Sequence, residues 1–230
     1  MTDNMEKVAL HIIARISTPF GEKFGVPRQS GLVDTAAKII FEPQFRSAEA
    51  VRGLEGFSHL WLLWQFDRNG EKWSPTVRPP RLGGNRRLGV FATRSPFRPN
   101  PIGLSCVELE KMDFDAPDGP IIHIRGADLV DGTPIFDIKP YVPYCDARPE
   151  AKGGFTDGLA SAELGLDFPP ALLEKVPQDK RDGLCATLRA DPRPRYQDDA
   201  ERVYGLVFGG QNVRFRVVEG VVTVVEVEKA

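Results

Sequence analysis

The chain has 230 residues, a hydrophobic fraction of 41% and a formal net charge of −2, from 30 basic and 32 acidic residues. This length holds one domain of ordinary size, or one domain with a small second unit. No apolar run approaches the roughly 18 residues that a membrane helix needs, and the N-terminal stretch does not resemble a signal peptide, so we expect a cytoplasmic protein.

Residues that bind metals or form disulfides are few. The three cysteines and three histidines stand far apart in the chain: Cys106, Cys145, Cys185, His11, His59 and His123. Because metal sites and disulfide frameworks in small proteins show short, repeated spacings, we predict no metal. The glycine fingerprints of Rossmann and P-loop proteins are missing, as is the G-x-S-x-G motif of hydrolases.

Short apolar runs rich in Val, Ile and Phe, punctuated by 20 prolines and 22 glycines, predict a mainly β N-terminal unit. Seven short strands are typical of a closed or nearly closed barrel. One helix is expected between them, because Ser47 is a suitable N-cap, Glu49 lies in the first turn and Gly56 provides a stop. The expected strands are residues 8–16, 38–41, 58–66, 88–93, 104–111, 121–125 and 135–138.

The sequence changes character after Tyr144, where small and polar residues are typical of a linker. We therefore expect a barrel domain over residues 1–148 and a small α+β domain over residues 149–230. Pro170 and Pro177 suit the first turns of two helices. Strands are expected at residues 203–208, 213–218 and 221–227, joined by tight turns.

Positive charge is concentrated between Lys72 and Val107, where no acidic residue occurs. The rest of the chain has 23 basic against 32 acidic residues, so the nearly neutral total hides a basic segment that is typical of a polyanion-binding surface. The alternative is that single arginines are structural and stack on prolines or pair with distant carboxylates. The basic residues of the segment are Lys72, Arg78, Arg81, Arg86, Arg87, Arg94 and Arg98.

Four polar clusters combine turn residues with charged or amide groups: residues 24–31, 78–87, 94–101 and 128–141. In the third cluster, prolines at positions 96, 99 and 101 predict a stiff loop outside any helix. In the last cluster, aspartates flank the turn at residues 132–134. Asp131 either caps backbone amides of that turn or has a chemical role.

Four segments in this order resemble the TsaA-like, or TrmO/YaeB, family of S-adenosylmethionine-dependent tRNA methyltransferases: FGVPRQSG, VRGLEGFSHLWLL, TVRPPRLGGNRRLGVFATRSPFRPNPIGLS and DLVDGTPIFDIKPYVPY. The resemblance covers roughly residues 8–145, and DPRPRYQ at 191–197 is similar to the family's small C-terminal domain. It implies a β-barrel fold unlike the Rossmann methyltransferases and a homodimer. It also implies methylation of the exocyclic amine of threonylcarbamoyladenosine beside the anticodon, with S-adenosylmethionine as the cofactor.

The resemblance also implies site residues. It places contacts to the cofactor at Arg28, Gln29, Ser30, Gln65, Phe66, Arg94, Leu104, Arg125, Gly126, Ala127 and Asp128. Methyl transfer from a sulfonium requires alignment of the reacting groups and no metal. Arginines suit the methionine carboxylate of the cofactor, and carboxylates suit its cationic sulfur.

The amine that accepts the methyl group must lose a proton, so a base is expected, with Asp131 and Asp137 as candidates. Arg98 and Asn100 suit the threonyl carboxylate, and Phe97 suits stacking on the target base in the anticodon loop. The remaining arginines of the basic segment are expected to bind tRNA phosphates: Arg78, Arg81, Arg86 and Arg87.

Two other functions fit the same residues. One is an RNA-binding barrel without catalysis, in which the basic segment clamps phosphates. The other is an S-adenosylmethionine-dependent methyltransferase that acts on a small molecule, which the nearly neutral net charge favours and the basic segment opposes.

Overall fold

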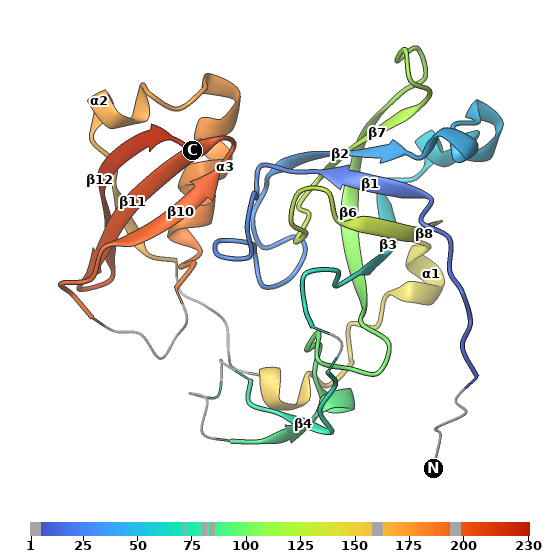
Figure 1. The fold of residues 1–230 in the computed structure, drawn as a ribbon, viewed down its shortest axis with the longest axis horizontal. Helices are drawn as coiled ribbons and strands as arrows, with labels where there is room; N and C mark the ends of the chain where they lie inside the picture. The colour runs from blue at the N-terminus through green and yellow to red at the C-terminus, as the bar shows by residue number, and fades with distance from the viewer. Residues whose placement is uncertain (1–5, 71, 80–81, 83–85, 158–162, 194–198) are drawn as a thin grey trace.

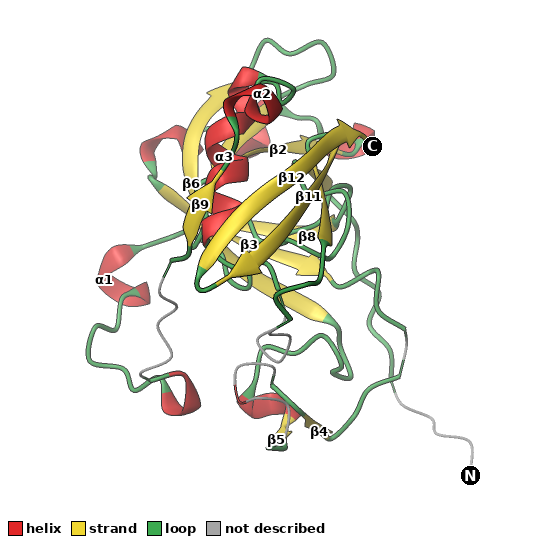
Figure 2. Ribbon diagram, turned by 90° about the vertical axis from the view of Figure 1, so that its left-hand side faces the viewer, coloured by secondary structure: helices red, strands yellow, loops and turns green. Residues whose placement is uncertain are grey.

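The computed structural model describes residues 6–70, 72–79, 82, 86–157, 163–193 and 199–230 (Figures 1 and 2). Within these ranges, six strands form a closed antiparallel barrel in the order β1-β2-β7-β6-β3-β8. Their bounds are β1 Ala14–Ser17, β2 Ala36–Phe41, β3 His59–Gln65, β6 Ile102–Asp113, β7 Ile121–Arg125 and β8 Pro134–Pro140. The fold is therefore mainly β, as the sequence predicts.

Alternation of side chains along the strands builds the barrel core. In β3, Leu60 and Leu62 are fully buried and Trp64 is nearly so, while the residues between them are more exposed. The same alternation occurs in β2, and the inward side chains of all these strands form one apolar cluster. Closure of the sheet pairs the backbone groups that would otherwise lie on an exposed strand edge.

Two predictions for the barrel domain are wrong. The expected helix after Ser47 is replaced by short 3₁₀ turns, Ala48–Val51 and Leu54–Gly56, because Gly53 between them adopts a left-handed φ of +87°. Ser47 makes no side-chain capping bond. The expected barrel strand at residues 88–93 lies outside the barrel, where β5 (Leu88–Gly89) pairs with β4 (Thr76–Val77).

Other boundaries differ by a few residues. The first barrel strand begins at Ala14 and not at Val8, whereas β2 and β6 are longer than expected. Other short elements among the described residues are the 3₁₀ turns Pro43–Phe45, Val90–Ala92 and Gly154–Thr156, and the helix α1 (Pro143–Asp146).

A separate C-terminal domain contains the sheet β10-β11-β12-β9 and two helices (Figure 1). The expected helices and strands are present, and Pro170 and Pro177 lie at the starts of the helices. The strand β9, which pairs in parallel with β12, was not expected, because three residues are too few to show an alternating pattern. The bounds are β9 Gly165–Asp167, α2 Pro170–Leu173, α3 Gln178–Arg189, β10 Tyr204–Phe208, β11 Gln211–Val218 and β12 Val221–Lys229.

The segment between β1 and β2 connects the barrel to the C-terminal domain. Phe20 is fully buried in the C-terminal core, where its ring packs edge-on against Phe208 with 5.5 Å between the ring centroids. The backbone N–H of Gly209 donates a 2.7 Å hydrogen bond to the carbonyl of Pro19. The C-terminal domain therefore fixes the path of this segment, which continues to Arg28 and Gln29.

We expect Phe20→Ala to lower the free energy of unfolding by about 3–5 kcal/mol, because it removes a buried ring and leaves a cavity between the domains. Urea denaturation followed by circular dichroism measures this loss. Tyr144→Ala is the control: its side chain is 89% exposed, so its effect should stay within about 0.5 kcal/mol. Equal effects of the two substitutions would contradict the role given to Phe20.

Candidate functional site

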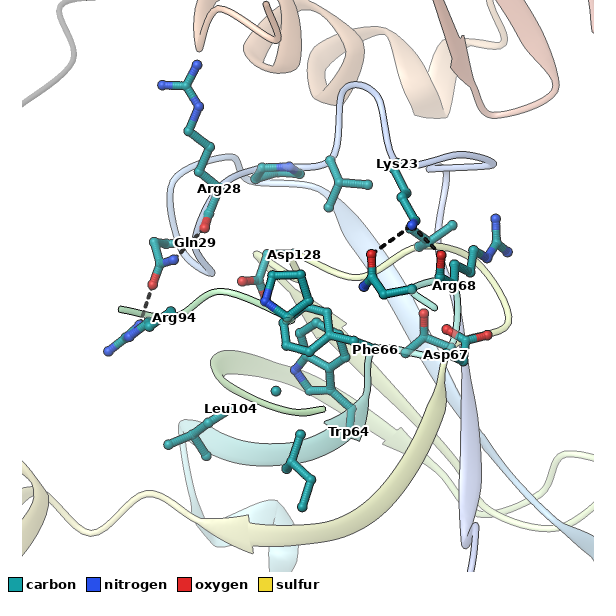
Figure 3. Close-up of a pocket in the computed structure, with 18 of the residues that line it drawn as sticks. Lys23, Arg28, Gln29, Trp64, Phe66, Asp67, Arg68, Arg94, Leu104 and Asp128 are labelled. Atoms are coloured by element: carbon teal, nitrogen blue, oxygen red, sulfur yellow. Dashed lines mark hydrogen bonds between the residues drawn. The ribbon is translucent and has the colours of Figure 1, made fainter. Parts of the chain in front are cut away.

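A pocket of about 490 Å³ lies at one end of the barrel, where the loops between strands meet (Figure 3). Its walls come from the segment between β1 and β2, the end of β3, the loop before β6, the start of β6 and the chain after β7. The lining residues used below are Lys23, Arg28, Gln29, Trp64, Phe66, Asp67, Arg68, Asn69, Arg94, Arg98, Gly103, Leu104 and Asp128. This volume lies within the range of about 300–1,000 Å³ that is usual for small-molecule sites.

Two aromatic rings form the apolar part of the pocket. The rings of Trp64 and Phe66 lie 4.3 Å apart between centroids and are tilted by 59°. Gly103 lies opposite Trp64 in the β3–β6 pairing, and a Cβ atom at this position would lie 2.2 Å from the indole. The absence of a side chain at Gly103 therefore lets the indole lie flat against β6.

A carboxylate lies beside these rings. The indole Nε1 of Trp64 donates a 2.9 Å hydrogen bond to Ser105 Oγ, and Ser105 Oγ donates a 2.5 Å hydrogen bond to Asp128 Oδ1. Burial raises the pKa of Asp128, while the Ser105 bond, the nearby Arg94 charge and a backbone N–H from Ser30 act in the opposite direction. A partly buried carboxylate next to aromatic faces is an environment that attracts a cation.

One end of the pocket is cationic and rich in donors. Arg94 Nη1 donates to Gln29 Oε1, and Gln29 Nε2 donates to the carbonyl of Arg28 at 2.5 Å. Arg28 Nη2 donates to the carbonyl of Arg193 in the C-terminal domain at 2.7 Å. The Arg28 guanidinium thus points away from the rings (Figure 3), whereas Arg94 and Gln29 offer donors that suit a carboxylate ligand.

The opposite end contains polar residues to which sequence reasoning gave no role. Lys23 Nζ donates to Asn69 Oδ1 at 2.9 Å and to the carbonyl of Arg68. The Arg68 guanidinium donates to the carbonyls of Gly21 at 3.0 Å and Asp131 at 2.7 Å. Isolated charged residues in loops carry no periodic or motif signal, so nothing in the sequence marked these side chains.

The structure brings together six of the residues that the sequence assigned to the cofactor. They come from separate parts of the chain but line one pocket: Arg28, Gln29, Phe66, Arg94, Leu104 and Asp128.

The other five residues assigned to the cofactor lie outside the described lining. Ser30 Oγ accepts a 3.1 Å hydrogen bond from the backbone N–H of Cys106, so Ser30 joins the segment before β2 to strand β6. Gly126 has a φ of +77° and its carbonyl accepts a bond from the backbone of Gly31, while Ala127 is part of the barrel core.

The side chains of Gln65 and Arg125 do not belong to the described lining of the pocket and have other contacts. Gln65 lines a second cavity of about 290 Å³. Arg125 forms ion pairs with Asp34 at 2.5 Å and with Glu110 at 3.3 Å, and these partners raise its pKa.

The two expected bases also lie outside the described lining of the pocket. Asp131 Oδ1 accepts a 2.9 Å hydrogen bond from the backbone of Thr18, so its side chain has a structural contact to the segment after β1 and not to the turn at residues 132–134. Asp137 forms an ion pair with Lys139 at 2.9 Å and accepts a bond from the backbone of Ile138.

The residues expected to bind substrate are dispersed. Arg98 lines the pocket, where its Nη1 donates to the carbonyls of Thr93 at 3.0 Å and Ser95 at 3.2 Å and shapes its own loop. Phe97 is exposed, and Asn100 lines the second cavity with Gln65.

The expected phosphate-binding arginines lie apart from the pocket lining. Arg78, Arg86 and Arg87 are exposed near β4 and β5, where Arg87 Nη1 donates to Thr76 Oγ1 at 2.9 Å. Arg81 lies outside the described residues. The described arginines of this region thus form part of an exposed basic surface, as a polyanion-binding face requires.

Two further searches cover the described part of the chain. None of its helices has the length and apolar character needed to cross a membrane. In the same ranges, no group of three or more His, Cys, Asp or Glu residues is placed to hold a metal ion.

The fold and pocket define a β-barrel protein with a site for a small ligand that has both cationic and anionic groups. Residues 15–147 match the family model of the tRNA-methyltransferase O N-terminal domain, and residues 162–230 match that of the TrmO C-terminal domain. The chain belongs to the TrmO family of tRNA methyltransferases.

Individual relatives agree with this membership. The chain is 44% identical over 217 residues to the tRNA (adenine(37)-N6)-methyltransferase of Escherichia coli (strain K12), covering 90% of this chain and 92% of that protein. It is also 44% identical over 166 residues to the protein of the same name from Eikenella corrodens, covering 71% and 93%. A crystal structure of TrmO from Pseudomonas aeruginosa has a TM-score of 0.78 at 30% identity, covering 97% of this chain and 99% of that one.

We expect Gly103→Ala to lower the free energy of unfolding by about 1–3 kcal/mol, because the added methyl group forces the Trp64 indole to move. Tryptophan fluorescence should change as well, since the indole loses its bond to Ser105. Gly56→Ala is the control, because a Cβ atom there meets no described atom within 4 Å. Unchanged stability and fluorescence in the first variant would show that the indole does not depend on Gly103.

Proposed function

We propose that this protein transfers a methyl group from S-adenosylmethionine to the exocyclic N6 amine of threonylcarbamoyladenosine beside the anticodon of tRNA. We further propose that it acts as a homodimer in the cytoplasm. The relatives from Escherichia coli and Eikenella corrodens are named tRNA (adenine(37)-N6)-methyltransferases, which supports this activity. The main structural support is one pocket that presents arginines, an aromatic pair and a buried carboxylate to a single ligand.

The residues of the pocket fit the cofactor. When bound, S-adenosylmethionine supplies an electrophilic methyl group on a positively charged sulfur. Asp128 offers a carboxylate to that charge, and the ring of Phe66 offers an apolar face to an adenine. Arg94 and Gln29, already joined by a hydrogen bond, offer donors to the methionine carboxylate.

The protein contributes alignment, exclusion of water and a proton acceptor. Trp64 and Phe66 keep the centre of the pocket apolar, which strengthens the electrostatic interactions of Asp128. Among the described lining residues, Asp128 and Asp67 carry carboxylates, whereas Asp131 and Asp137 lie outside it. We therefore assign the proton from the amine to the Asp128 carboxylate, because its raised pKa makes it a stronger base than an ordinary aspartate.

Binding of the cofactor should weaken as the pH falls through the raised pKa of Asp128. The ionised carboxylate attracts the sulfonium cation and the protonated form does not, so affinity is highest above that pKa. Because the pKa is raised, the decline should begin above the region near 4 where an exposed aspartate titrates. Calorimetry from about pH 8 to about pH 4 measures this dependence, because this range reaches the region where an exposed aspartate titrates.

Asp128→Asn is the control for this titration. It should bind the cofactor more weakly than the wild type at neutral pH and should lose the acidic decline, because the amide does not titrate. Parallel pH profiles for the two proteins would rule out Asp128 as the titrating group.

The activity itself is tested with the purified full chain, labelled S-adenosylmethionine and tRNA that contains threonylcarbamoyladenosine. Transfer of label to the N6 position of that nucleoside is the expected result. Arg94→Ala should raise the dissociation constant of the cofactor by about 10- to 100-fold, with an unchanged melting temperature.

The alternatives predict different results. Failure of the folded protein to bind the cofactor, together with salt-dependent binding of tRNA, would favour an RNA-binding barrel, to which the exposed arginines near β4 and β5 correspond. Binding of the cofactor without methylation of any tRNA would favour a small-molecule substrate.

A further inference from the structure

The pocket has a second polar end, opposite the arginines proposed to hold the cofactor. Figure 3 shows Arg28, Gln29 and Arg94 on one side and Lys23, Asp67 and Arg68 on the other, with the aromatic rings and Asp128 between them. The contacts proposed for the cofactor use Gln29, Arg94, Phe66 and Asp128, and they leave the polar groups around Lys23 without a role.

Lys23 is a defined donor at that end. Its ammonium group has three N–H donors. Two of them bond to Asn69 Oδ1 at 2.9 Å and to the backbone carbonyl of Arg68, both acceptors that are neutral. These bonds hold the ammonium at the pocket rim without neutralising its charge, and a third N–H remains to meet a ligand.

The backbone beneath Lys23 is held by Arg68. Its guanidinium bonds to the carbonyls of Gly21 and Asp131, which ties the chain after β3 to the segment between β1 and β2 and to the turn before β8. The same segment is anchored in the C-terminal core at Phe20. The loop that carries Lys23 is thus held in place by several contacts. Because the loop is already ordered, less conformational entropy is lost when a ligand binds.

The neighbours of Lys23 define the chemistry of the ligand. Asp67 supplies a carboxylate and Asn69 supplies an amide at the same end of the pocket. A cation, a carboxylate and an amide together suit a group that carries an anion next to hydroxyl or N–H donors. A bare adenine has no such anion, whereas an amino-acid substituent on its N6 position has a carboxylate and donors.

We propose that Lys23, with Asp67 and Asn69, forms the subsite for a carboxylate-bearing, amino acid-like substituent on the N6 atom of the target adenine. This inference rests on the proposed function. It moves recognition of the substrate carboxylate from Arg98 and Asn100 to Lys23, because Arg98 bonds to its own loop and Asn100 lines the second cavity. The subsite selects a modified adenine, since an unmodified base leaves the lysine without an anionic partner.

The test compares tRNA that carries threonylcarbamoyladenosine with the same tRNA carrying unmodified adenosine. The variants are Lys23→Met, which removes the charge at similar length, and Lys23→Arg, which retains it. Lys38→Met is the matched control, because Lys38 is an exposed lysine on β2 that does not line the pocket. Melting temperature and calorimetric affinity for S-adenosylmethionine are measured for every variant.

Lys23→Met should lower kcat/KM for the modified tRNA by about 10- to 100-fold through loss of one charge-assisted hydrogen bond. Its melting temperature and cofactor affinity should match those of the wild type. Binding of the unmodified tRNA should not change. Lys23→Arg should recover most of the activity, and Lys38→Met should behave as the wild type.

Four results would overturn the subsite. If Lys23→Met weakened the binding of modified and unmodified tRNA equally, Lys23 would bind a backbone phosphate. Weaker binding of the cofactor would mean that Lys23 holds the methionine carboxylate. Unchanged kcat/KM for the modified tRNA, with normal methyl transfer by the wild type, would contradict the subsite but leave the proposed function intact. Absence of both cofactor binding and methyl transfer in the wild type would overturn both.

Discussion

The pocket depends on one hydroxyl group, that of Ser105, which accepts a bond from Trp64 and donates one to Asp128. This pair of bonds sets the plane of the indole and the direction of the carboxylate together. An apolar ring and a carboxylate at fixed positions suit a cation that also has flat, apolar parts. Gly103, two residues before Ser105 on β6, leaves the space in which the indole lies.

The C-terminal domain contributes to the same site through packing. Phe20 belongs to the C-terminal core, and Arg28, eight residues later, lines the pocket and bonds to the carbonyl of Arg193. The segment between these residues includes Lys23. Both polar ends of the pocket therefore include residues of a segment that packs against the C-terminal domain, so that domain helps to shape the pocket.

The sequence predicted the barrel, the separate C-terminal domain and most strands, because alternation and turn residues are local signals. It did not predict the break at Gly53, because the helix was expected to continue to Gly56, although glycine is the residue that most readily adopts a left-handed φ. The resemblance pointed to Arg28, Arg94 and Asp128 through long motifs, and the structure places these residues in the lining of one pocket. It did not separate the residues that line the pocket from those that support it, such as Ser30, and it gave no signal for Lys23.

The most direct test of the account is a crystal structure of the protein bound to S-adenosylhomocysteine, the product form of the cofactor. The account predicts that the adenine lies against Phe66, that the sulfur lies near Asp128, and that the homocysteine carboxylate contacts Arg94. A ligand bound instead in the second cavity, beside Gln65 and Asn100, would contradict it.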